Sequence, residues 1–424
     1  MGTAGILIFS FFAFLSISLS EIGLWIALFA IVIQRQTVQT LKKDPVVVLF
    51  AIFSLYILGL TAWAIWQFPE TEKTQIKDGI SWLKLWFFIC LAWWLKADIK
   101  KIHLCLFLAL LGLLTGIFMY IDWSNPISLF TIERTGFHLK KPLAFSLYCT
   151  SSLLGLFIFA GRLFEKNFIR WTRPPLHFYK GVIFFAWLLC ILLLFQALIL
   201  TKARTTWIAT VLVFPPALWA MYGRVNLTLK KRVIMGMCAV IILAVFSYNL
   251  PGIKKRVSEE KEVIMALKNG DLKNIPSTPL GYRIHLYEFG IKKWLESPIF
   301  GWGPGSTKYL VSQTGRQELK HPQYKGGFDW LDHLHNTYLS TLFRLGIAGA
   351  VILSTALFFI LKSLWKAKKS DLLPHDLAVY LTAVFAITSI WCLTDFRALH
   401  YDWMNFWTIL CGISYTFALH QEKT

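Results

Sequence analysis

A polar cluster stands directly before an apolar segment in DWLDHLHNTYLSTLFRLGIAGAVIL, residues 329–353. The apolar part is about long enough to cross a bilayer. Two histidines, His333 and His335, lie next to Asn336 at its mouth. A histidine has an unperturbed pKa of about 6.5, so a neutral imidazole can accept a proton near neutral pH. The stretch therefore predicts acid–base chemistry at the end of a membrane helix. A second interpretation is that His335 only anchors this helix at the interface.

The rest of the chain predicts an all-α integral membrane protein with about twelve transmembrane helices. Of its 424 residues, 56% are hydrophobic and 16% are charged, whereas about a quarter are charged in soluble proteins. Apolar runs of roughly 15–25 residues recur along the chain. They lie at about 5–20, 22–34, 46–64, 80–95, 102–120, 143–160, 181–200, 206–222, 231–248, 337–361, 377–394 and 403–420. A signal peptide is a rival interpretation of residues 1–20, although basic residues do not precede the run.

The net charge of +20 reflects topology rather than a nucleic-acid partner. Lysine and arginine concentrate in alternate loops, which is the positive-inside pattern. This pattern predicts that both termini are cytoplasmic and that residues 249–336 lie outside. The predicted organisation is residues 1–248 with helices one to nine, residues 249–336 as an external helical loop, and residues 337–424 with helices ten to twelve.

The large loop 249–336 is predicted to contain two amphipathic helices, at about 254–268 and 282–295. Ser297-Pro298 and the run GWGPG at 301–305 end the second helix. Helices of this kind would rest on the membrane surface or cap the bundle. The GWGPG run is interpreted mainly as loop geometry, and its backbone N–H groups could alternatively bind a phosphate.

Three segments resemble the O-antigen ligase/polymerase family of bacterial membrane glycosyltransferases, which are of GT-C type. The first is LTKARTTWIAT at 200–210. The second is R-x10-W-x3-P-x2-G-x-G-P-G, from Arg283 to Gly305. The third is HLHNTYLSTLFRLGIAGA at 333–350. The similarity covers roughly residues 196–350 in motif terms, and residues 1–195 carry no motif of the family.

The resemblance implies transfer of a glycan from an undecaprenyl-diphosphate-linked donor to an acceptor hydroxyl. This would occur on the periplasmic face of the bacterial inner membrane. Ligases of the family use lipid A–core as the acceptor, polymerases extend a repeat chain, and other relatives glycosylate protein. The length and the HLHN form look most like a ligase. The implied partners are donor, acceptor and membrane lipids, with no nucleic acid and no cofactor.

The resemblance also implies roles for individual residues. His335 would be the general base, and Arg204 and Arg283 would bind the diphosphate, since a guanidinium matches phosphate oxygens. Either arginine could instead contact lipid headgroups. No metal is expected, although Asp329 and Asp332 could in principle bind a cation. A transporter is the alternative outside this class, but the polar cluster lies at helix ends rather than at the midplane.

Four further residues are expected to support the site. His333 is structural or tunes His335, and Asn336 caps the following helix or orients His335. Arg344 lies inside the apolar segment, where an arginine is costly unless it is paired. Its expected partner is Asp395, which is itself a candidate site residue, or a lipid phosphate.

Overall fold

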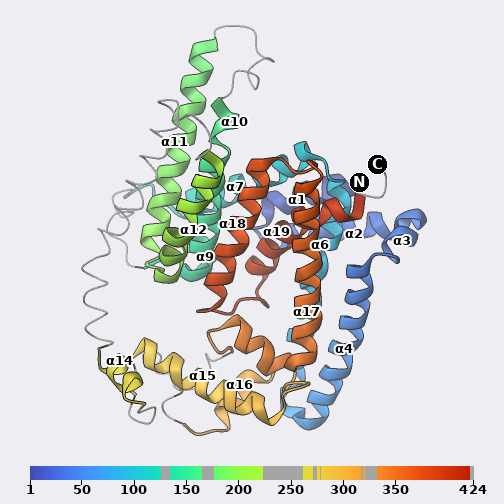
Figure 1. Ribbon diagram of the computed structural model, residues 1–424, viewed down its shortest axis with the longest axis vertical. Helices are drawn as coiled ribbons and strands as arrows, with labels where there is room; N and C mark the ends of the chain where they lie inside the picture. The colour runs from blue at the N-terminus through green and yellow to red at the C-terminus, as the bar shows by residue number, and fades with distance from the viewer. Residues whose placement is uncertain are drawn as a thin grey trace.

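Every regular element that the structure describes is a helix (Figure 1). The structure is a computed structural model, and it describes residues 1–125, 134–164, 176–222, 261–270, 275–276, 278–316, 319 and 332–420. The predicted all-α class is confirmed for these residues.

Seven helical segments are long and apolar enough to cross a membrane. They are α4 (Pro45–Gln67), the succession Pro69–Leu95, α7 (Ile99–Tyr120), Gly181–Leu200 of α11 (Leu176–Leu200), α12 (Arg204–Tyr222), α17 (Thr337–Lys369) and α18 (His375–Cys392). The succession comprises η1 (Pro69–Thr71), α5 (Glu72–Lys84), η2 (Leu85–Phe87) and α6 (Phe88–Leu95). The protein is therefore a multi-pass membrane protein.

Further apolar helices leave the total number of spans open among the described residues. The bent pair α2 (Ile17–Ile33) and α3 (Arg35–Leu41) forms an eighth span if it is counted as one. The apolar helices α1 (Gly2–Phe12) and α9 (Pro142–Ile158) are shorter. The predicted run at 231–248 lies outside the described residues, so the number twelve stays a prediction.

The centre of the bundle is formed by α19 (Tyr401–His420) packed on α6. All of α6 and most of α19 are buried. A helix surrounded by protein can carry polar groups that lipid would not tolerate, and α19 contains the buried Asp402 and Asn405. The loop between α18 and α19 therefore lies over the centre of the bundle and can present side chains there.

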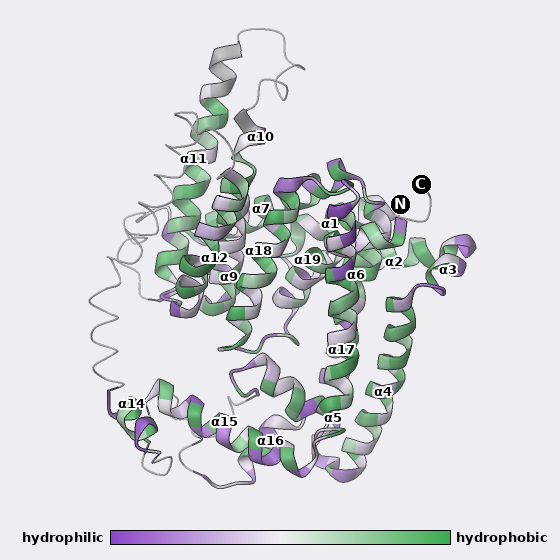
Figure 2. Ribbon diagram, viewed as in Figure 1, coloured by the Kyte–Doolittle hydropathy of each residue, from purple (hydrophilic) through white to green (hydrophobic). Residues whose placement is uncertain are grey.

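Three helices lie across one end of the bundle, which we call the loop end (Figure 1). They are α14 (Lys261–Lys268), α15 (Pro279–Glu296) and α16 (Thr307–Ser312). Figure 2 shows hydrophilic residues concentrated on them, while the bundle helices are mainly hydrophobic. The predicted helix at 282–295 is confirmed as α15, which ends at Glu296 with Ser297 as its C-cap. The helix predicted at 254–268 is described only from Lys261.

A break divides α17 into a loop-end part and a long apolar part. Gly346 has φ +60° and ψ −170°, a conformation that is essentially restricted to glycine. The segment 298–303 pairs with the main chain at the break: Ile347 N donates to Pro298 O at 2.8 Å, and Trp302 N donates to Phe343 O at 3.0 Å. Unpaired backbone groups are costly in a membrane, so this pairing stabilises the break.

The pairing at the break ties α15 firmly to α17. The Tyr56 hydroxyl of α4 donates to the carbonyl of Leu345 at 2.5 Å and to that of Phe300 at 3.2 Å. Within α15, Phe289 packs against Phe343 of α17 with ring centroids 5.9 Å apart. Two elements that carry predicted site residues, α15 and the start of α17, are thus held together.

Candidate active site

The short segment Asp332–Asn336 carries both histidines into the loop end of the bundle. Asn336 caps α17, since Leu339 N donates to its Oδ1 at 3.0 Å, and its Nδ2 donates to Leu393 O at 3.2 Å. The capping role proposed for Asn336 is confirmed. The hydroxyl of Tyr287 on α15 donates to the carbonyl of His335 at 3.0 Å. His335 itself has φ +52°, an uncommon conformation for a residue that is not glycine.

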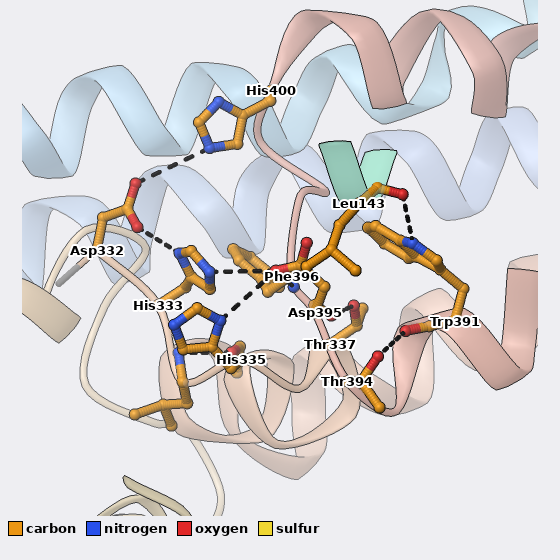
Figure 3. Close-up of polar contacts among 12 residues, drawn as sticks. Leu143, Asp332, His333, His335, Thr337, Trp391, Thr394, Asp395, Phe396 and His400 are labelled. Atoms are coloured by element: carbon orange, nitrogen blue, oxygen red, sulfur yellow. Dashed lines mark hydrogen bonds and ion pairs between the residues drawn. The ribbon is translucent and has the colours of Figure 1, made fainter. Parts of the chain in front are cut away.

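His333 and His335 converge on the carboxylate of Asp395 (Figure 3). His333 Nε2 lies 3.3 Å and His335 Nδ1 lies 3.7 Å from the same oxygen, Oδ1. The imidazole rings are 4.4 Å apart. Asp395 is buried and comes from the loop between α18 and α19, where its carbonyl accepts a bond from Thr337 Oγ1 at 2.7 Å. The structure thus brings together three residues that are up to 62 positions apart in the sequence.

Two further groups extend this cluster toward its edge (Figure 3). His333 Nδ1 makes a short contact with Asp332 Oδ1. His400 Nε2 lies 3.9 Å from the other carboxylate oxygen of Asp332. Imidazoles and carboxylates therefore alternate from His335 through Asp395, His333 and Asp332 to His400.

The surroundings of the two histidines give them opposite protonation states at neutral pH. Burial, together with the positive charge of His333, lowers the pKa of His335 to about 4. Burial alone would also lower the pKa of His333, but the carboxylates of Asp332 and Asp395 raise it to about 9. Burial would raise the pKa of Asp395, yet the two imidazoles hold it well below its usual range. His335 is therefore a neutral imidazole, paired with an ionised carboxylate, that can accept a proton.

The same three residues could instead hold a metal ion. One nitrogen from each histidine and one oxygen of Asp395 all lie within 4.8 Å of one another. His333 Nε2 and His335 Nδ1 are buried and make no hydrogen bond of good geometry. Two imidazoles and a carboxylate suit zinc, iron or manganese. The expectation that no metal takes part remains a prediction, and chelation is its test.

Arg283 lies beside the histidine cluster. It is partly buried on α15, and its positive charge contributes to the lowered pKa of His335. Burial raises the pKa of Tyr287, and the charge of Arg283 opposes that rise. The Tyr287 hydroxyl donates to the main chain of His335. The structure therefore places the predicted base and one predicted diphosphate-binding arginine within electrostatic reach of each other.

Arg204 lies next to a residue that contacts the Asp395 loop. It is exposed at the start of α12. The next residue, Thr205, accepts a hydrogen bond at 2.9 Å from Thr394, which directly precedes Asp395. The Arg204 turn is therefore fastened to the loop that carries Asp395.

The prediction that Arg344 pairs with Asp395 or with a lipid phosphate is wrong. Its Nη1 pairs with Asp78 of α5 at 2.8 Å and also donates to Pro304 O at 2.5 Å. Its Nη2 donates to Asp332 O, and its guanidinium lies 5.1 Å from the ring centroid of Phe396. Arg344 is 2% exposed, so it positions the Asp332 segment from within the protein rather than meeting a lipid phosphate.

The GWGPG run does not present its backbone N–H groups to a ligand. Gly301 N donates to Ser297 O at 2.9 Å, and Gly303 N donates to Arg344 O at 3.0 Å. Gly305 N donates to Gln75 Oε1 at 2.7 Å. These donors are used within the protein, which favours the interpretation of the run as loop geometry.

An apolar cavity of about 330 Å³ begins next to the cluster. Its lining includes Thr337 and Cys392 near Asp395, and it follows α17 as far as Ile360. Tryptophans of neighbouring helices, Trp82 and Trp403 among them, complete the walls. The cavity therefore runs from the side of the Asp395 loop into the apolar part of the bundle.

Comparison with known proteins agrees with the motifs. No curated protein matches the chain. The family model described as O-antigen ligase matches residues 188–354, which include Arg204, Arg283, both histidines and Arg344. Members of this family are ligase- or polymerase-type membrane enzymes that resemble glycosyltransferases. The resemblance is therefore confirmed: residues 188–354 form a domain of the O-antigen ligase family.

Proposed function

We propose that the protein is an O-antigen ligase that transfers a glycan from undecaprenyl diphosphate to a sugar hydroxyl of lipid A–core. The loop end would face the periplasm and both termini the cytoplasm of a bacterium. The observation that carries the proposal is the imidazole of His335 at 3.7 Å from the buried carboxylate of Asp395, with the charge of Arg283 within electrostatic reach. A base and a guanidinium at the mouth of an apolar cavity are what transfer from a lipid diphosphate requires.

The reaction follows from the roles of these groups. The acceptor oxygen attacks the anomeric carbon of the donor while His335 removes the hydroxyl proton. The bond from that carbon to the diphosphate oxygen breaks, and the leaving diphosphate keeps the electron pair. Arg283 and Arg204 stabilise its developing negative charge, which is preorganised electrostatic catalysis. Attack from the face opposite the leaving group would invert the anomeric centre.

Asp395 acts through His335. Its carboxylate lies 3.7 Å from His335 Nδ1, so it favours the tautomer whose Nε2 is free to accept the proton and stabilises the imidazolium that forms. His333 holds Asp395 from the other side. Both are positioning residues rather than groups that touch substrate.

The apolar cavity along α17 supports a polyprenyl donor. Thr337 lines the cavity, and its hydroxyl donates a hydrogen bond to the main chain of Asp395. A carrier chain lying in the cavity would place its diphosphate at the loop end, within reach of the arginines. The donor head would therefore meet the base without leaving the membrane surface.

The test is a transfer assay with the purified protein in lipid nanodiscs. The substrates are undecaprenyl-diphosphate-linked glycan and lipid A–core. A glycan covalently joined to lipid A–core is the expected product, and it should form equally in the presence of EDTA. Longer lipid-linked glycan without acceptor modification would instead identify a polymerase. No new glycosidic bond with any acceptor would refute glycosyl transfer.

A further inference from the structure

Basic residues gather on the loop-end rim of the bundle, beside the histidine cluster. We call this set the basic rim; its members, all exposed, are Arg134, Lys140, Lys141, Lys202 and Arg204. Lys140 and Lys141 directly precede α9, while Lys202 and Arg204 lie in the turn from α11 to α12. The glycan-transfer mechanism uses only Arg204 among them.

Main-chain contacts hold the two parts of the basic rim together. The Nε of Arg134 donates to the carbonyl of Thr201 at 3.1 Å. Thr135 N donates to Leu200 O at 3.2 Å. The segment before α9 therefore lies against the turn between α11 and α12, and the two sets of cationic residues become neighbours.

The basic rim is also joined to the catalytic loop. Thr394 Oγ1 donates to Thr205 Oγ1 at 2.9 Å, and the indole of Trp391 donates to Leu143 O at 3.0 Å. Figure 3 shows Leu143, Trp391 and Thr394 next to Asp395. The starts of α9 and α12 are thus fixed to the end of α18, directly before the carboxylate that orients His335.

Two lysines of the rim occupy unfavourable backbone conformations. Lys140 has φ +57° and Lys202 has φ +50°, in the left-handed region that favours glycine or asparagine. Lysine offers no local side-chain bond that would offset this strain. Gathering like charges adds repulsion. A ligand of opposite charge would relieve the repulsion between these lysines.

We propose that the basic rim binds a phosphate group of the acceptor glycolipid and so places its hydroxyl at His335. The proposal rests on the proposed ligase function and names the acceptor class: a phosphorylated glycolipid. The diphosphate of the donor already has Arg283 and Arg204, which leaves Lys140, Lys141 and Lys202 for a second anion. Lysine binds phosphate as a point charge without demanding a fixed orientation. Because the rim is fastened to the Asp395 loop, it fits a reacting substrate better than a bulk lipid headgroup.

The experiment compares two acceptors and three proteins in nanodiscs. The acceptors are lipid A–core as isolated and the same preparation after phosphatase treatment. The proteins are wild type, K140Q/K141Q/K202Q and the control K73Q/K77Q/K292Q, which removes the same charge from exposed positions of α5 and α15. The measured quantity is kcat/KM for each acceptor at saturating donor.

Wild type and the control should prefer the phosphorylated acceptor by about tenfold, because exposed ion pairs each contribute modestly. The rim variant should lose most of that preference. Equal use of both acceptors by wild type, or a rim variant that keeps the preference, would overturn the inference. A rim variant that is impaired equally with both acceptors would assign the lysines to headgroups or donor and also overturn it. Wild type that transfers to neither acceptor would instead refute the ligase function itself.

Discussion

Replacing Asp395 by Asn tests how much the buried carboxylate contributes to catalysis. The substitution keeps the size of the side chain and an oxygen that can accept the bond from Phe396 N, which is 2.9 Å long. It removes the negative charge 3.7 Å from His335 Nδ1. At an effective dielectric constant of about 20, a full charge pair at that distance is worth about 4 kcal/mol. If about half of the imidazolium charge has developed in the transition state, the loss is about 2 kcal/mol, or roughly 30-fold in kcat.

The assay is the pH dependence of glycan transfer. In wild type, kcat/KM should fall as the pH drops through about 4, where His335 becomes protonated. Without the Asp395 charge the imidazolium is less stable, so this decline should move to lower pH. Asp371→Asn is the matched control, because Asp371 is exposed in the turn between α17 and α18. A folded Asp395→Asn protein with kcat within twofold of wild type would refute the role given to Asp395.

Three further predictions concern the surroundings of the base. Arg283→Ala should lower kcat/KM for the donor by about 10- to 100-fold, since a hydrogen bond to a charged group contributes about 1.5–3 kcal/mol; an unchanged value would make Arg283 a headgroup contact. Gly346→Ala should lower the free energy of unfolding by about 3 kcal/mol, because the added Cβ would lie 2.2 Å from Ile299 O. The control is Gly59→Ala in α4, whose Cβ meets nothing within 4 Å and which should leave the stability unchanged. The pKa of His333 in the folded protein is about 9, above its usual value. Its contribution to stability is therefore complete below about pH 6.5 and is lost as the pH rises through 9. The melting temperature of wild type should fall over this pH range, and His333→Gln should remove that fall.

Much of the site was predictable because its signals are local. The histidines and Asn336 stand directly before an apolar run, and a helix start needs a capping residue there. The end of α15 follows from Ser297 and the glycines after it. In each case the deciding residues lie within a few positions of one another.

The features that sequence did not reveal depend on contacts between distant segments. Arg344 pairs with Asp78, which is 266 positions away. The sequence around Asp78 gives no sign that this carboxylate is the partner of an arginine in another helix. The break at Gly346 lies inside an apolar run that looks continuous, because its stabilising partners are in the 298–303 segment. The shared contact of His333 and His335 with Asp395 likewise arises from packing of α17 against α18.

The most direct measurement of the central claim is single-turnover transfer by His335→Gln in nanodiscs, with donor binding measured in parallel. A base that removes the acceptor proton predicts a folded variant that binds donor as wild type does but forms the new glycosidic bond at least about 100-fold more slowly. Transfer at a rate near that of wild type would show that another group takes the proton.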